Sequence, residues 1–329
     1  MARIVLALGT SHSPALNTTL DEYIHHADRD RDRGWQLDKD GNPCSYEELV
    51  ARADAHVRNE IRPETLGRRI DACCDNIARL AEILRATPLD ALIVIGDDQK
   101  EQYHEDNMPA LLVYWGETIR NGVLPLPPSA PAHWRRARQQ FHEIDAPRDY
   151  PVAAALGRHL IESLIDREFD VAHSRKLSSE IGEGHAFGFV HRRLMDEHIV
   201  PMVPIVLNTY YPPNQPRPRR CYALGRAIRE AVEGWNGDAR VGIVASGGLS
   251  HFTVDEELDN MVLDACRDHD AEALCTIPVR KLNSGNSEIR NWIAVAGAAE
   301  GLNVAWSDYQ PCYRSEAGTG CGMAFAVWS

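Results

Sequence analysis

The stretch RIVLALG, residues 3–9, is followed at once by T-S-H-S-P at residues 10–14. A short apolar run that stops at small and polar residues is typical of a buried strand that ends in a tight turn. Five more runs of this kind follow along the chain, at residues 91–96, 110–115, 202–207, 240–245 and 323–328. We expect all six to be strands of one largely internal sheet.

Longer segments between these runs have helical spacing. In residues 63–85 the apolar side chains recur every three or four positions, which predicts an amphipathic helix. Similar helices are expected at residues 152–167, 217–235, 254–267 and 288–301. Because strands and helices alternate, we predict an α/β fold with a central, mostly buried sheet flanked by helices. We treat residues 1–329 as a single-domain sandwich with an inserted helical excursion.

Two regions interrupt the alternation. Residues 21–60 are rich in charge and poor in apolar side chains, so we expect a charged insertion at about residues 20–65 that serves as a flap or an oligomer contact. Residues 122–151 contain six prolines and several arginines. We interpret this second region as a long surface loop.

Composition narrows the classes of function. The net charge of −13 disfavours binding to nucleic acid or to an anionic membrane, although a few local arginines can still bind a small anion. No stretch approaches the roughly 20 apolar residues that a membrane span needs. The eight cysteines include no C-x2-C pair, so we expect reduced, mostly buried thiols and a cytoplasmic protein.

Polar residues are concentrated in four segments at the ends of predicted strands or the starts of helices. They are G-T-S-H-S-P at 9–14, G-D-D-Q-K-E-Q-Y-H-E-D-N-M-P at 96–109, A-S-G-G-L-S-H-F at 245–252, and L-N-S-G-N-S-E-I-R-N-W at 282–292. In open α/β sheets, ligands bind beyond the carboxyl ends of the strands. We therefore expect a metal-dependent enzyme whose site is built around His12, His251 and Glu288.

Each of these segments also has an ordinary structural interpretation. His12 can be a metal ligand or can cap the next helix, and residues 96–109 can supply ligands or form a solvated acidic loop. His251 follows a glycine pair that permits close backbone approach, so it suits acid/base work or is incidental to the start of a helix. Glu288 can bind a metal or simply favour a helix N-terminus. Two histidines and one carboxylate form the facial arrangement of non-haem Fe(II) enzymes.

Taken together, these segments resemble the class III extradiol ring-cleavage dioxygenases, the relatives of the protocatechuate 4,5-dioxygenase catalytic subunit. The resemblance also covers L-N-T-Y-Y-P-P-N-Q-P at 207–216, R-R-C-Y-A-L-G at 219–225 and the tail D-Y-Q-P-C-Y-R-S-E-A-G-T-G-C-G-M-A-F-A at 308–326. The most similar subgroup is that of the 3-O-methylgallate dioxygenases. The resemblance implies Fe(II), a catechol-type acid such as gallate or 3-O-methylgallate, and O2 as second substrate. Separately, we expect a homodimer.

The resemblance also implies roles for individual residues. His12 and Glu288 match metal ligands, His251 matches the acid/base histidine, and His185 in G-E-G-H-A-F-G matches a histidine that contacts substrate. The candidates for binding the substrate acid are Tyr210, Tyr211, Arg290 and Arg314.

One departure concerns the third metal ligand. The family has a histidine in an N-D-H segment where this chain has D-D-Q, so Gln99 occupies the ligand position. Either Gln99 binds the metal or His104, five residues further on, replaces it, and we favour His104. The departure keeps two other functions open, a metal-dependent hydrolase that uses Zn²⁺ and a non-enzymatic binding protein.

Overall fold

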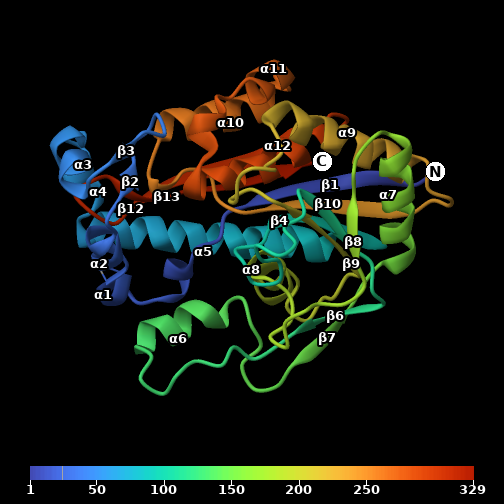
Figure 1. Cartoon of the computed structure of the whole chain (residues 1–329), viewed down its shortest axis with the longest axis horizontal. Coiled ribbons are helices and arrows are strands. Elements are labelled where there is room, and N and C mark those ends of the chain that lie inside the picture. Colours follow the sequence, from blue (N-terminus) through green and yellow to red (C-terminus); the bar gives the residue numbers. More distant parts are fainter. Residues whose placement is uncertain (24) are drawn as a thin grey trace.

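The computed structural model describes residues 1–23 and 25–329 and is built on a nine-stranded sheet (Figure 1). Eight strands run in the order β11-β13-β1-β10-β4-β9-β5-β8, and β12 pairs with β13. Their bounds are β1 Arg3–Thr10, β4 Ala91–Asp97, β5 Leu111–Tyr114, β8 Ala172–Ser174, β9 Met202–Leu207, β10 Arg240–Ser246, β11 His251–Thr253, β12 Val304–Tyr313 and β13 Thr319–Trp328.

Four strands at the centre of the sheet are parallel. β1 pairs with β10, β10 with β4, and β4 with β9, all in parallel register, whereas β13 runs antiparallel to β1. The carboxyl ends of β1, β4, β9 and β10 consequently lie along one edge of the sheet. This arrangement brings the polar segments that follow them to one place.

Helices cover both faces of the sheet, which confirms the predicted α/β class. α7 (Ala154–Asp166), α9 (Pro218–Glu233) and α12 (Ile289–Ala298) pack on one face, and α5 (Pro63–Ala86) and α8 (His185–Phe189) pack on the other (Figure 1). Alternate residues of β4 divide between the two apolar cores, because successive side chains of a strand point to opposite faces. In the described part of the chain, no helix is both long and apolar enough to cross a membrane.

Most predicted elements are confirmed within a few residues, but β12 was missed. Most of this strand is only partly buried, and it includes Ser307, Asp308 and Gln310, so no apolar run marks it in the sequence. Its partner β13 is buried throughout and begins four residues before the predicted strand, at Thr319. The remaining regular elements are α10 Glu256–Asp268, α11 Ala271–Cys275, η2 Val190–Met195, η3 Val279–Leu282 and η4 Ser284–Glu288.

The prediction of a surface loop over residues 122–151 is wrong. This region contains α6 (Ala132–Gln139) and β7 (Arg148–Pro151), and β7 pairs with β6 (Thr118–Asn121). Four of the six prolines precede α6, with Pro131 as its N-cap, and the other two follow it, so none interrupts the helix. The helix packs against the turn Pro14–Asn17 after β1, where the Gln140 side chain donates to the Ser13 carbonyl at 2.7 Å.

The charged insertion forms short elements against the core. They are α1 Leu20–Tyr23, α2 His25–Asp32, β2 Gln36–Leu37, β3 Pro43–Cys44, α3 Tyr46–Arg52 and α4 Val57–Glu60. Buried Asp30 of α2 holds this segment to the sheet, because it accepts from the Arg314 guanidinium at 2.6 and 2.8 Å and from the Thr319 hydroxyl at 2.6 Å. α2 therefore lies over β13, which places the insertion beside the ends of the parallel strands.

The contact between α9 and α12 depends on a glycine. A Cβ atom at Gly225 would lie 1.8 Å from the carbonyl oxygen of Ala294. We expect Gly225→Ala to lower the free energy of unfolding by about 3 kcal/mol, because the backbone of α12 has to move away. The matched control is Gly67→Ala in α5, where the nearest atom to the new Cβ is 3.7 Å away. There alanine should raise the free energy of unfolding by at most about 1 kcal/mol. Urea unfolding of both variants measures the difference, and equal midpoints would contradict this account.

Candidate active site

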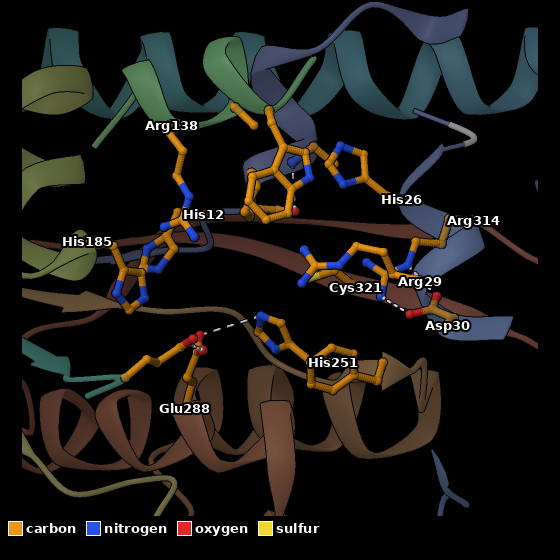
Figure 2. A pocket seen from close by; sticks show the side chains of 18 of the residues that line it. His12, His26, Arg29, Asp30, Arg138, His185, His251, Glu288, Arg314 and Cys321 are labelled. Carbon is orange, nitrogen blue, oxygen red and sulfur yellow. Dashed lines mark hydrogen bonds and ion pairs between the residues drawn. The ribbon is translucent and has the colours of Figure 1, made fainter. Parts of the chain in front are cut away.

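A cavity of about 740 Å³ opens at the edge where the parallel strands end (Figure 2). Its wall is assembled from the turn after β1, helix α2 of the insertion, helix α6, the loop after β4, and the segments around residues 251, 288 and 320. The cavity brings together His12, His185, His251 and Glu288, which come from four separate parts of the sequence.

His12 follows β1 and is buried. The Ser246 hydroxyl donates to the Ala186 carbonyl at 2.7 Å and lies 3.3 Å from His12 Nδ1, so Nδ1 is the donor in that contact. The lone pair is then on Nε2, which is buried and has no hydrogen-bond partner in the described structure. Burial lowers the pKa of His12 well below its usual range, and the nearby His185 and His251 lower it further. A neutral imidazole with a free, buried Nε2 is suited to bind a metal.

His185 is the first residue of α8, and its ring centroid lies 5.0 Å from that of His12. Its Nδ1 lies 2.7 Å from a carboxylate oxygen of Glu101, which also accepts from the His185 backbone N–H. Burial alone would lower the pKa of His185, but the carboxylates of Glu101, Asp97 and Glu288 together outweigh burial and raise it to about 10. A carboxylate on Nδ1 that leaves Nε2 facing the site is the arrangement that orients metal-binding histidines.

Glu288 is buried and lies directly before α12 without capping it. One carboxylate oxygen accepts from the Gly248 N–H at 2.8 Å, and the other accepts from the Tyr210 hydroxyl at 3.2 Å. The carboxylate thus points into the cavity, held by the segment after β10 and by the segment after β9. A carboxylate fixed in this way is preorganised to bind a cation.

Asp97, the last residue of β4, completes a group of possible metal ligands. Ligand atoms of Asp97, His185 and Glu288 all lie within 4.8 Å of one another. Both carboxylate oxygens of Asp97 are buried and have no side-chain or backbone donor in the described structure. Burial, with the added repulsion of Glu288, raises the pKa of Asp97 to about 8. A divalent cation between the two carboxylates would remove that repulsion, so the residues present fit a metal, and nitrogen with oxygen ligands suit iron, zinc or manganese.

His251 lies on β11, across from the histidine pair. Its Nδ1 lies 2.8 Å from the Leu249 carbonyl oxygen, and its Nε2 lies 3.5 Å from Glu288 (Figure 2). Burial alone would lower the pKa of His251, but Cys321 and Glu288 together raise it to about 10. The Nδ1 contact fixes the ring, so the Nε2 edge is free to exchange a proton with a molecule in the cavity.

The glycine pair before His251 permits close approach to the backbone, as the sequence predicts. Gly247 has a φ of +150°, and a Cβ there would lie 2.9 Å from a Glu288 carboxylate oxygen. A Cβ at Gly248 would lie 2.2 Å from the His251 ring. Only glycine lets both side chains approach this backbone so closely.

The structure separates the two candidates for the third ligand. Gln99 lines the cavity, with its amide nitrogen 3.5 Å from Glu288 Oε1, whereas His104 is exposed and does not line it. The reason is the tight turn after β4, in which the Asp98 carboxylate accepts from the backbone N–H groups of Glu101, Gln102 and Tyr103. This turn carries His104 out to the solvent, contrary to the preference stated from the sequence.

Of the four residues predicted to bind the substrate acid, two line the cavity and two do not. Arg290 is fully buried and donates to the main-chain carbonyls of Pro216, Thr209 and Leu282, so it does not reach the cavity. Tyr211 also lies outside the cavity, with Lys100 4.7 Å from its ring centroid. Tyr210 and Arg314 do line the cavity, although Asp30 already neutralises Arg314.

Several residues of this site were not singled out from the sequence. Asp97 and Glu101 stand in the acidic segment after β4, which was interpreted only as a source of ligands or as a solvated loop. The E-G-H pattern at residues 183–185 gives no sign that His185 pairs with Glu101, which is 84 positions away. Arg138 was assigned to a surface loop, and a helix prediction for this segment would have been the signal that it can face the cavity.

Comparison with known proteins agrees with this architecture. Residues 135–319, more than half of the chain, match the family described as the catalytic LigB subunit of aromatic ring-opening dioxygenase. The chain belongs to this family, which confirms the resemblance to the class III extradiol type.

Two curated relatives are similar over shorter stretches. A gallate dioxygenase of Pseudomonas putida is 38% identical over 111 residues, which is 32% of this chain and 31% of that protein. A 2,3-dihydroxyphenylpropionate/2,3-dihydroxicinnamic acid 1,2-dioxygenase of Comamonas testosteroni is 35% identical over 100 residues, 30% of each chain. The match therefore spans about a third of the length of each relative.

Proposed function

We propose that this protein is a non-haem Fe(II)-dependent extradiol dioxygenase that cleaves the ring of a catechol-type acid, such as gallate or 3-O-methylgallate, with O2. The observation that carries the proposal is the convergence of Asp97, His185 and Glu288. The ring centroid of His12, whose buried Nε2 has no partner in the described structure, lies 5.0 Å from that of His185. Membership of the ring-opening family supports it, as do the two relatives named for dioxygenases of aromatic diols.

We assign the metal to Glu288 and the Nε2 atoms of His185 and His12, with Asp97 as a further carboxylate at the same site. These histidines and Glu288 form a set of two histidines and one carboxylate without His104. When bound, Fe(II) supplies a centre at which the catechol hydroxyls and O2 come together and exchange electrons. Glu101 orients His185 from behind, because it occupies Nδ1 and leaves Nε2 for the metal.

The proton transfers are assigned to His251. Its Nε2 lies 3.5 Å from Glu288, so a catechol hydroxyl placed at the metal site lies within its reach. In its neutral form the imidazole accepts a proton from the hydroxyl, and it returns a proton when the ring opens. Tyr210, which donates to Glu288, is placed to contact the same hydroxyl groups.

Oxygen uptake by the protein after anaerobic loading with Fe(II) tests this function. Gallate and 3-O-methylgallate are expected to consume O2 in equal amount and to give a yellow ring-opened product. The control, 4-hydroxybenzoate, lacks the diol and should consume none. Hydrolysis by zinc-loaded protein without O2 uptake would instead favour a hydrolase, and metal binding without any turnover would favour a binding protein. The homodimer and the cytoplasmic location stay predictions.

A further inference from the structure

Four arginines reach the proposed substrate cavity, and two of them already have clear roles. Arg314 forms the buried ion pair with Asp30. Arg33 lies between two aromatic rings, with its guanidinium carbon 4.3 Å from the ring centroids of both Trp35 and Phe252. Arg29 and Arg138 also line the cavity, and neither has a carboxylate or carbonyl acceptor within the described residues.

Of these two, Arg138 has the setting of a binding residue. It lies in the last turn of α6 and is half-buried, whereas Arg29 is exposed and its guanidinium carbon lies 5.1 Å from the Trp134 ring centroid. Figure 2 shows the Arg138 side chain entering the cavity from the side opposite Glu288 and His251. A guanidinium that is partly removed from water and has no acceptor has lost hydration without a compensating bond.

The acidic groups near Arg138 are engaged elsewhere. Glu101 is bound to His185, and Glu288 accepts from Gly248 and Tyr210 on the opposite wall. Among the described residues, no carboxylate lies within ion-pair distance of Arg138, even though Asp32 also lines the cavity and the chain carries a net charge of −13. A ligand that brings its own carboxylate would satisfy this site with two parallel hydrogen bonds, the geometry that guanidinium groups favour.

We propose that Arg138 binds the carboxylate of the aromatic substrate and is the residue that selects acids over uncharged catechols. This inference rests on the proposed function, because it takes the ring hydroxyls to lie at Glu288 and the histidines. With the hydroxyls there and the carboxylate on α6, the ring spans the cavity between the two walls. Arg138 thus takes the role that the sequence suggested for Arg290.

Equilibrium binding of gallate and of methyl gallate, its uncharged ester, tests the proposal. Titrations follow tryptophan fluorescence of the metal-loaded protein without O2, so that no turnover is needed. Arg138→Gln should weaken gallate binding by about 10- to 100-fold, the range expected for losing a charge-assisted pair. In the same variant, the dissociation constant for methyl gallate should stay within about twofold of the wild-type value, because the ester has no carboxylate for Arg138 to bind. Arg138→Lys should retain part of the affinity for gallate.

The matched control is Arg135→Gln on the same helix. Arg135 donates to the carbonyls of Pro127 and Pro128 and does not line the cavity, so both affinities should stay unchanged. An equal loss for gallate and its ester would overturn the proposal, since Arg138 would then only shape the wall. Unchanged gallate binding in Arg138→Gln, or a wild-type protein that binds neither acid nor ester, would overturn it as well. If acid-selective binding depends on Arg138 but no O2 is consumed, the proposed function fails and this inference stands.

Discussion

Glu288→Ala is expected to lower the affinity of this protein for its divalent metal by more than about 100-fold, and ring cleavage with it. Loss of a residue that merely supports a ligand typically costs about 10- to 100-fold, so loss of a direct ligand should cost more. Removing the carboxylate also leaves the donors Gly248 N–H and Tyr210 hydroxyl without their acceptor. Competition with a chromophoric chelator measures the affinity.

Two further variants make this result specific. Glu101→Gln should lower the affinity for the metal by the smaller factor of about 10- to 100-fold. His185 keeps its Nε2 in this variant, but its Nδ1 loses the charged partner. Glu233→Ala, at an exposed position at the end of α9, should bind metal as the wild type does. If Glu288→Ala binds iron as tightly as Glu233→Ala, the metal lies elsewhere and the assigned ligand set is wrong.

His251→Gln is expected to reduce kcat by about 100- to 10,000-fold, the usual contribution of a positioned acid/base group. Glutamine keeps a polar side chain of moderate size but cannot shuttle a proton. The affinity for metal should change little, since the two histidines assigned as ligands and Glu288 remain in place. Single-turnover measurements with metal-loaded protein separate this effect from substrate binding.

His198→Gln is the control for the histidine substitution, because His198 is exposed and does not line the cavity. It should retain full kcat and metal content. Full turnover by His251→Gln would remove this residue from proton transfer. A parallel loss of kcat and metal content would instead make His251 part of the metal site.

Much of the fold was predictable because its signals are local. Each central strand is a continuous apolar run, since both faces of the sheet are covered, and each major helix shows a repeat of three or four. The failures have physical reasons too. β12 is only partly buried along most of its length and lacks such a run, and the prolines before α6 hide a helix whose few buried positions include Ala137.

The candidate site was predictable to the extent that it follows the strand ends. His12, His251 and Glu288 stand in segments that the parallel strands must bring to one edge of the sheet, and the structure brings all three to the cavity. Their roles as ligands or acid/base groups remain proposals. His104 shows the limit, because the hydrogen bonds from three backbone N–H groups to Asp98 turn it outward, and spacing alone does not reveal a turn of that kind.

By itself, the sequence determined the α/β class and the strand ends at which chemistry can occur, because apolar periodicity is enough to specify them. Only the tertiary structure decided which side chains have partners. Arg290 donates to main-chain carbonyls and Arg314 pairs with Asp30. Within the described residues, the Nε2 of His12 has no hydrogen-bond partner, and Arg138 lines the cavity without an ion pair. Whether a polar group is free depends on contacts between residues far apart in the chain, and such contacts exist only once the core has packed.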